Sequence, residues 1–263
     1  MRLASLAATL LVTMSAHAEN NLRLYAAGSL RAAFTELVAA FRAKTGTQVA
    51  ATFGASGLLR ERIEKGESAD VFASANMQHP RSLEQAGRAG PVRAFARNRL
   101  CALARPELRV DSDTLLERML DPAVKLGTST PTADPSGDYA FELFAKADGA
   151  RPGARAKLER KALKLTGGPD APPQAPTGRS LYALLLAEHK ADLFLTYCTN
   201  AVEARSENAS LQVVQIPPPL AVGAVYGLVV MRGARPGAQG FASFVLSPEA
   251  QRILASHGFD APR

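Results

Sequence analysis

The sequence contains little of several residue types on which common chemistries depend. Its 263 residues include no tryptophan, two cysteines and four histidines. Neither cysteine has a Cys or His partner at ligand spacing, so no zinc motif is present. No G-x-x-x-x-G-K-[ST] run occurs either, and nucleotide hydrolysis on a P-loop is therefore not indicated. Of the histidines, His79, His189 and His257 stand alone, outside any motif.

Basic clusters are also missing, although the formal net charge is +7. Lys and Arg are scattered among Glu, and no basic run alternates with aromatics, so we expect no nucleic-acid partner. The hydrophobic content of 47% is that of a globular protein. A mildly basic surface still attracts small anions by long-range steering.

Residues 1–18 have the composition of a secretory signal peptide. Arg2 supplies the positive start, residues 6–14 are apolar, and Ala16-His17-Ala18 is a small-residue cleavage site. The apolar run is too short to span a bilayer, and no later run is longer. We therefore expect a mature protein that begins near Glu19 and is periplasmic. No cysteine follows the cleavage site, so no lipid anchor is expected.

The two cysteines, Cys101 and Cys198, both lie in strand-like runs. An exported protein is free to form disulfides, and two cysteines are the minimum for one. A Cys101–Cys198 disulfide is the preferred interpretation, and two buried thiols are the alternative.

The mature chain opens with a strand, a tight turn and a helix. Residues 24–27 are apolar, Gly28 permits a sharp turn, and Ser29 is predicted to cap a helix that Gly46 ends. Such a turn directs unpaired N–H groups, a hydroxyl and the positive end of a helix dipole to one place. This arrangement predicts an anion site that needs no charged side chain.

The same arrangement recurs twice. Strand 48–53 leads through Gly54-Ala55-Ser56-Gly57 into a helix at 58–64, and strand 125–129 leads through a loop with Ser136 into another helix. Since the carboxyl ends of parallel strands meet at one edge, we expect Ser29 and Ser56 to share a ligand.

The remaining pattern alternates strands and helices. Five further segments are strand-like: 69–75, 100–104, 191–198, 211–216 and 221–231. Six are helical: 80–86, 113–120, 153–162, 179–189 (capped by Thr177), 236–246 and 248–257. Residues 167–176 are expected to form a loop. This order predicts an α/β protein with right-handed crossovers. Residues 19–100 with 218–263 are expected to form the first lobe, and 101–217 the second.

Six short pieces of the chain, in order, resemble one family. They are Ala26-Ala27-Gly28-Ser29-Leu30, Phe53-Gly54-Ala55-Ser56-Gly57, residues 69–75, Pro135-Ser136-Gly137 with Tyr139-Ala140, Tyr197 in Tyr-x-Thr-x-Ala, and Ser-His-Gly-Phe at 256–259. Together they resemble the periplasmic molybdate-binding proteins of molybdate ABC importers, which are type II periplasmic solute-binding proteins. The resemblance covers essentially the whole mature chain.

The resemblance implies a two-lobed fold that holds molybdate or tungstate in the cleft between the lobes. Ser29 and Ser56 match hydroxyl donors, Ser136 a backbone N–H donor, and Tyr197 a tyrosine whose hydroxyl reaches the anion. A further backbone donor is expected at about Arg179. Ser29, Ser56 and Tyr197 would contact the metal's oxygens without ligating the metal directly. The resemblance implies no cofactor. It implies a monomer whose partner is an ABC permease in the inner membrane.

The chain departs from the family pattern at three places. Thr177-Gly178-Arg179-Ser180 stands where an apolar residue followed by Arg is usual, and Asn76 and Asn200 each stand where Asp is expected. These departures leave the identity of the anion open. Arg179 could add a direct charge contact.

The chemistry of the expected donors fits a dianion without protons. Hydroxyls and N–H groups donate to its oxygens, whereas a carboxylate would repel it and phosphate would need an acceptor for its proton. Sulfate or another oxyanion is the main alternative ligand. A Ser-dependent hydrolase is the other alternative, but Leu58 stands where G-x-S-x-G requires Gly. The sequence therefore predicts a binding protein that is not an enzyme.

Overall fold

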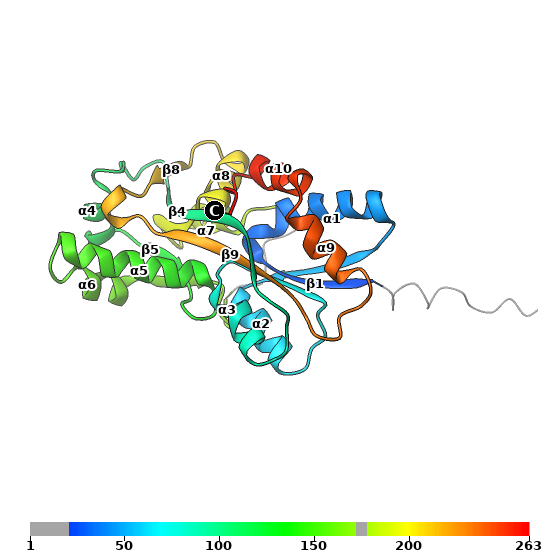
Figure 1. The fold of residues 1–263 in the computed structure, drawn as a ribbon. Helices are drawn as coiled ribbons and strands as arrows, with labels where there is room; N and C mark the ends of the chain where they lie inside the picture. Colours follow the sequence, from blue (N-terminus) through cyan, green and yellow to red (C-terminus); the bar gives the residue numbers. More distant parts are fainter. Residues whose placement is uncertain (1–20, 172–177, 263) are drawn as a thin grey trace, which may run out of the picture.

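The computed structural model describes residues 21–171 and 178–262. The predicted signal peptide at 1–18 and the predicted cap Thr177 lie outside these residues. The chain forms two α/β lobes joined by long strands (Figure 1), which confirms the predicted fold class. Among the described helices, none combines the length and apolar character needed to cross a bilayer.

The first lobe opens with the predicted strand–helix units. They are β1 (Leu22–Ala27), the 3₁₀ turn η1 (Gly28–Leu30), α1 (Arg31–Thr45), β2 (Val49–Gly54), α2 (Ser56–Glu64), β3 (Val71–Ser74) and α3 (Gln78–Gln85). Strand β1 lies between β2 and β3 and pairs in parallel with both. The carboxyl ends of all three strands therefore meet at one edge.

The second lobe is built in the same way. Its elements are α4 (Leu115–Leu120), β5 (Leu126–Ser129), α5 (Pro135–Ala150), α6 (Ala154–Lys161), β6 (Leu163–Thr166), α7 (Leu181–Ala187), β7 (Leu193–Tyr197), α8 (Cys198–Glu207) and β8 (Gln212–Gln215). Strand β5 pairs in parallel with β6 and β7. Helix α8 and strand β6 were not predicted from the sequence.

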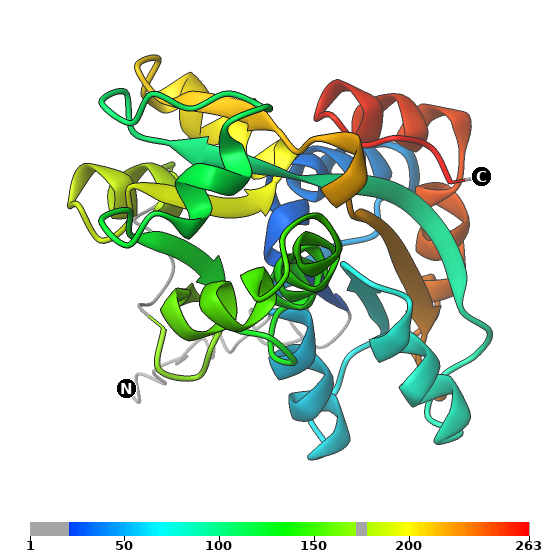
Figure 2. The same cartoon turned by 90° about the vertical axis from the view of Figure 1, so that its left-hand side faces the viewer.

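The chain returns to the first lobe through η2 (Pro218–Leu220), β9 (Gly223–Val230), α9 (Ala238–Val245) and α10 (Pro248–Ser256). Strand β4 (Arg93–Ala104) connects the two lobes, and Figure 2 shows it curving from one to the other. Up to Arg99 it pairs antiparallel with β9, and from Leu100 it pairs with β7. The predicted strand at 100–104 is thus the second half of a longer strand.

Aromatic packing fixes the helices on the first lobe. The buried face of α1 carries Phe34 and Phe41 at helical spacing, and both rings pack edge-on against Phe241 of α9. Burying one such ring stabilises the fold by about 2 kcal/mol. This packing holds α1, and with it the turn at its start, in a fixed position.

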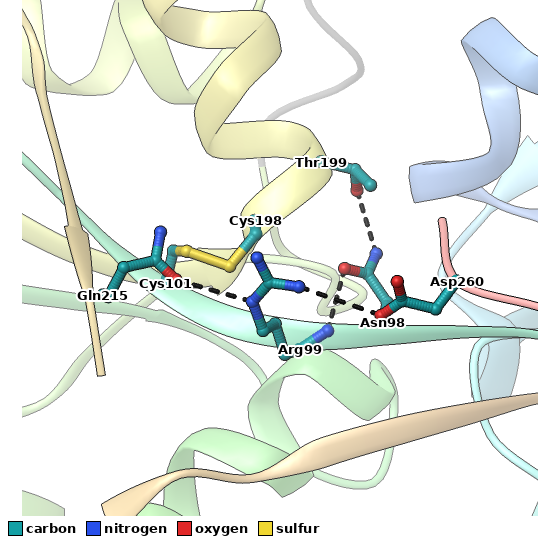
Figure 3. The surroundings of a disulfide bond; sticks show 7 residues. All are labelled: Asn98, Arg99, Cys101, Cys198, Thr199, Gln215 and Asp260. Atoms are coloured by element: carbon teal, nitrogen blue, oxygen red, sulfur yellow. Dashed lines mark hydrogen bonds and ion pairs between the residues drawn. A yellow bond between two sulfur atoms is a disulfide. The ribbon is translucent and has the colours of Figure 1, made fainter. Parts of the chain in front are cut away.

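Cys101 and Cys198 form a disulfide, which confirms the preferred interpretation. Cys101 lies on β4 and Cys198 is the first residue of α8 (Figure 3). The next residue, Thr199, accepts a hydrogen bond from the Asn98 side chain at 2.9 Å. The start of α8 is thus tied to β4 by one covalent bond and one hydrogen bond.

Candidate functional site

A cleft of about 440 Å³ lies where the strand ends of both lobes meet. Its lining includes all five residues predicted as ligand-binding, namely Ser29, Ser56, Ser136, Arg179 and Tyr197. They come from η1, α2, α5, the segment before α7 and β7 respectively. The structure therefore brings together residues that span most of the chain.

The two serine turns of the first lobe differ from the prediction in one respect. Ser29 lies inside the 3₁₀ turn and α1 begins at Arg31, so Ser29 is not its N-cap. In α2 the N-cap position is held by Ala55, and Ser56 is the first helical residue. Neither hydroxyl caps its helix.

The Ser56 hydroxyl accepts a hydrogen bond from the Ala75 N–H at 3.1 Å. Because a hydroxyl also carries one proton to donate, this bond leaves the Ser56 proton for another acceptor. Ser56 is 1% exposed and lines the cleft. A ligand oxygen in the cleft is in the right place to accept that proton.

The Ser29 hydroxyl belongs to a chain of hydrogen bonds. It lies 2.9 Å from the Tyr226 hydroxyl, which accepts a bond from the Asn98 Nδ2 at 3.4 Å. The Asn98 Oδ1 accepts from the Arg99 N–H at 2.9 Å, which fixes the orientation of the amide. Either hydroxyl can donate in the Ser29–Tyr226 bond. When Tyr226 donates, the Ser29 proton is left for a ligand in the cleft.

In the third turn, at Ser136, the backbone N–H is not free to bind an anion as expected. The Ser136 N–H, expected to bind the anion, donates to the Asp134 Oδ1 at 3.0 Å, because Asp134 is the N-cap of α5. The Ser136 Oγ is buried and has no partner within the described residues. If this turn donates to a ligand through Ser136, the available group is the hydroxyl.

Arg179 lines the cleft, but its guanidinium forms an ion pair with Glu207. Its Nε lies 2.6 Å from the Glu207 Oε1, and the Ser180 N–H donates to the Glu207 Oε2 at 2.6 Å. Helix α7 begins at Leu181, with Ser180 as its cap, and not at Arg179 as predicted. The guanidinium therefore supplies less positive charge to the cleft than an unpaired one would.

Tyr197 closes the base of the cleft. Its hydroxyl lies 3.5 Å from the Ala75 carbonyl oxygen of the first lobe, and its ring packs against Tyr226 with centroids 5.7 Å apart. Burial raises the pKa of Tyr197 well above its ordinary value. The hydroxyl therefore stays neutral and keeps its proton, which it donates to the Ala75 carbonyl oxygen.

Sequence reasoning missed the charged groups Asp134, Arg31 and Glu203, which also line the cleft. Burial raises the pKa of the Asp134 carboxyl to about 6, although bonds from the Ser136 N–H and the Ser129 side chain oppose this. The Asp-Pro pair at 134–135 is a helix-start signal that could have identified the cap. Burial also raises the pKa of Glu203, whereas the charge of Arg31 lowers it.

The charged groups of the cleft do not form a cluster of metal ligands. Within the described part of the chain no three His, Cys, Asp or Glu side chains gather as a metal site. The arrangement is instead a set of hydroxyl donors with a few charged groups around them. Its evident chemical capability is to bind the oxygens of a small solute.

Two relatives are similar over most of the chain. An uncharacterised protein of Pasteurella multocida is 40% identical over 208 residues, which are 79% of this chain and 86% of the relative. The molybdate-binding protein ModA of Escherichia coli is 25% identical over 254 residues, which are 92% and 89% of the two chains.

Two solved structures have the same fold. The periplasmic molybdate-binding protein of Azotobacter vinelandii matches with a TM-score of 0.72 at 19% identity, over 92% of this chain and 100% of its own. The sulfate-binding protein SubI of Mycobacterium tuberculosis matches with a TM-score of 0.72 at 19% identity, over 92% and 87%.

A family model covers nearly the whole described chain. The model of the bacterial extracellular solute-binding proteins matches residues 22–260. Proteins of this family bind solutes and are not enzymes, which confirms the prediction of a binding protein. The chain belongs to the bacterial extracellular solute-binding protein family.

Proposed function

We propose that this protein captures a tetrahedral oxyanion of the molybdate or tungstate type in its inter-lobe cleft and delivers it to the permease of an ABC importer. Capture takes place in the periplasm, after removal of residues 1–18. The anion is the cargo, and its oxygens are the atoms that the protein contacts.

The convergence of three serine hydroxyls carries the proposal. Ser56 accepts a bond from the Ala75 N–H and keeps its proton for the cleft, and Ser29 does the same when Tyr226 donates to it. The Ser136 hydroxyl is unpartnered within the described residues. Tyr197 adds a neutral hydroxyl. An anion with several oxygens and no proton can accept from the three serine hydroxyls at once, and from Tyr197 when its bond to the Ala75 carbonyl is exchanged for one to the ligand.

The charges around the cleft support selection by donors over selection by full cations. Arg179 is paired with Glu207, and Arg31 stacks on the Phe53 ring with Glu203 nearby. Neither guanidinium acts as an isolated positive charge. Discrimination among dianions then depends on the size of the closed cavity, as the similarity to both molybdate-binding and sulfate-binding proteins suggests.

A titration of the mature protein with molybdate, tungstate, sulfate and phosphate tests the proposal. An anion at a thousandfold its dissociation constant should stabilise the fold by about 4 kcal/mol, seen as a raised melting temperature. Stabilisation by molybdate and tungstate alone supports the proposal. Stabilisation by sulfate alone assigns the second candidate, a sulfate-binding protein.

The double variant Ser29→Ala, Ser56→Ala should abolish this stabilisation. The matched control is Ser82→Ala, Ser206→Ala, because those exposed hydroxyls donate only to helix carbonyls. Equal anion binding by both double variants would contradict the proposed site.

A further inference from the structure

A carboxylate of the chain itself occupies one of the positions where an anion would bind. Asp134 lines the cleft, and its Oδ1 accepts the Ser136 N–H at the start of the long helix α5. The hydroxyl of the same Ser136 is buried and has no partner among the described residues. A negative group and an unused donor thus lie in the same turn.

Asp134 is also close to the first-lobe donors. The preceding residue, Ala133, accepts a 2.8 Å hydrogen bond from the N–H of Gly57, which follows Ser56. On its other side, a Cβ at Gly167 would lie 2.4 Å from the Asp134 Cβ. The carboxylate is therefore held in place and cannot turn away towards β6 when a ligand enters.

The groups that face Asp134 do not neutralise it. Asp138 of its own helix adds repulsion, and the tyrosines that face it, Tyr182 of α7, Tyr197 of β7 and Tyr226 of β9, are kept neutral by burial. The remaining charged groups of the cleft are Arg31, Arg179 and Glu203. A dianion that enters would add two more negative charges beside Asp134.

We propose that the cleft binds its dianionic oxyanion together with one proton, and that Asp134 holds this proton. The inference rests on the proposed function and specifies how the site balances charge. In the protonated carboxyl, Oδ1 still accepts from the Ser136 N–H, while the other oxygen becomes a donor to the anion. The proton comes from solvent, and no covalent bond of the ligand changes.

The free protein is prepared for this step. Burial raises the pKa of Asp134 to about 6, so the carboxyl is mostly ionised at neutral pH but is easily protonated. A neighbouring dianion favours the neutral form further. By linkage, affinity should then fall about tenfold for each pH unit above the pKa of the free carboxyl.

Calorimetric titration with sodium molybdate, and with sodium sulfate in parallel, tests the inference. At a pH of about 7.5, the observed enthalpy is measured in buffers with different ionisation enthalpies, and the slope gives the number of protons taken up. We expect about one proton per anion for the wild-type protein, and an affinity that falls about tenfold per pH unit.

Two variants test which carboxyl group takes up the proton. Asp134→Asn keeps an N-cap that accepts from Ser136, since Asn is as good a cap as Asp, and it should bind the anion with about zero protons and little pH dependence. Glu203→Gln removes the other carboxyl that lines the cleft, and should leave the proton count at about one. The wild-type proton count stands even if a variant does not fold.

Each outcome has a defined meaning. Binding without proton uptake by the wild-type protein overturns the inference but leaves the proposed function intact. Proton uptake that persists in Asp134→Asn and disappears in Glu203→Gln overturns the assignment to Asp134. Absence of binding by either anion between about pH 6 and about pH 8.5 overturns the proposed function and the inference together.

Discussion

Gly57 and Ala133 join the two lobes by a backbone hydrogen bond: the Gly57 N–H donates to the Ala133 carbonyl at 2.8 Å. Gly57 lies in the first turn of α2 and Ala133 just before α5, so the bond crosses the cleft. The approach is close, because a Cβ at Gly57 would lie 2.4 Å from the Thr132 carbonyl oxygen. This contact between the lobes thus depends on the absence of a side chain at position 57.

Gly57→Ala should hold the lobes apart. Since the added methyl group meets rigid backbone, closure loses this bond, and anion affinity should fall by at least about tenfold. Titration calorimetry measures the affinity, and small-angle scattering should detect a larger radius of gyration with anion present. Gly240→Ala on α9 is the control, because nothing lies within 4 Å of its Cβ position. Unchanged affinity in Gly57→Ala would show that this contact is not needed for closure.

Tyr226→Phe should weaken anion binding without a ligand contact being removed. The hydroxyl of Tyr226 connects Asn98 to Ser29, and its loss frees the Ser29 hydroxyl to rotate. We expect a loss of about 1 kcal/mol in binding free energy, which is about fivefold in affinity. Tyr25→Phe makes the same chemical change at the Glu67 contact, outside the cleft lining, and should bind normally. Equal affinities for the two variants would exclude a positioning role for Tyr226.

His79 should make the fold acid-sensitive. Burial and the nearby Arg60 lower the pKa of His79 to about 4, and neither ring nitrogen has a partner within the described residues. Because the unfolded chain binds the proton at higher pH than the folded one, stability is lost as pH falls below the unfolded pKa. The loss between pH 7 and pH 4.5 should be about 2 kcal/mol.

Urea unfolding of the wild-type protein and His79→Gln at both pH values isolates this contribution. The variant should lose about 2 kcal/mol less on acidification, because its side chain takes up no proton. His189→Asn serves as the control, since His189 is exposed and Asn tolerates its positive φ of 56°. The same acid sensitivity in all three proteins would mean that other groups are responsible.

Removal of the disulfide should destabilise the protein without abolishing the site. Cys101→Ala with Cys198→Ala opens a covalent loop with a sequence separation of 97 residues, and should lower the free energy of unfolding by about 2–4 kcal/mol. Thermal unfolding with and without reductant measures the effect. Reductant should lower the melting temperature of the wild-type protein and leave the double variant unchanged; an effect on both would point to another cause.

Sequence reasoning succeeded where structure is determined locally. The Ser29 and Ser56 turns follow from a short apolar strand, a small turn residue and a helix with a buried stripe, and they are found where expected. The prediction that Ser29 caps its helix was wrong, because a 3₁₀ turn comes first and α1 begins only at Arg31. The helix predicted at 58–64 begins two residues earlier, at Ser56.

The missed features depend on contacts or on weak patterns. Helix α8 buries mainly small residues, Ala201 and Ala204 among them, so it has no large apolar stripe to reveal it. Glu203 was missed with its helix. The pairing of Arg179 with Glu207 joins segments 28 residues apart and requires the fold. The Asp134 cap was visible as Asp-Pro but was interpreted only as loop.

The pairing of β4 has a mechanical consequence. Its second half is anchored in the second lobe by β7, by β8 and by the disulfide at Cys101, whereas its first half bonds to β9 of the first lobe. The partners of β4 therefore change from the first lobe to the second between Arg99 and Leu100. We expect a rotation of one lobe against the other to bend β4 at this junction, next to the Asn98 amide that bonds to Tyr226. Opening of the cleft would then displace Asn98, and with it the Tyr226 and Ser29 hydroxyls, in the same movement.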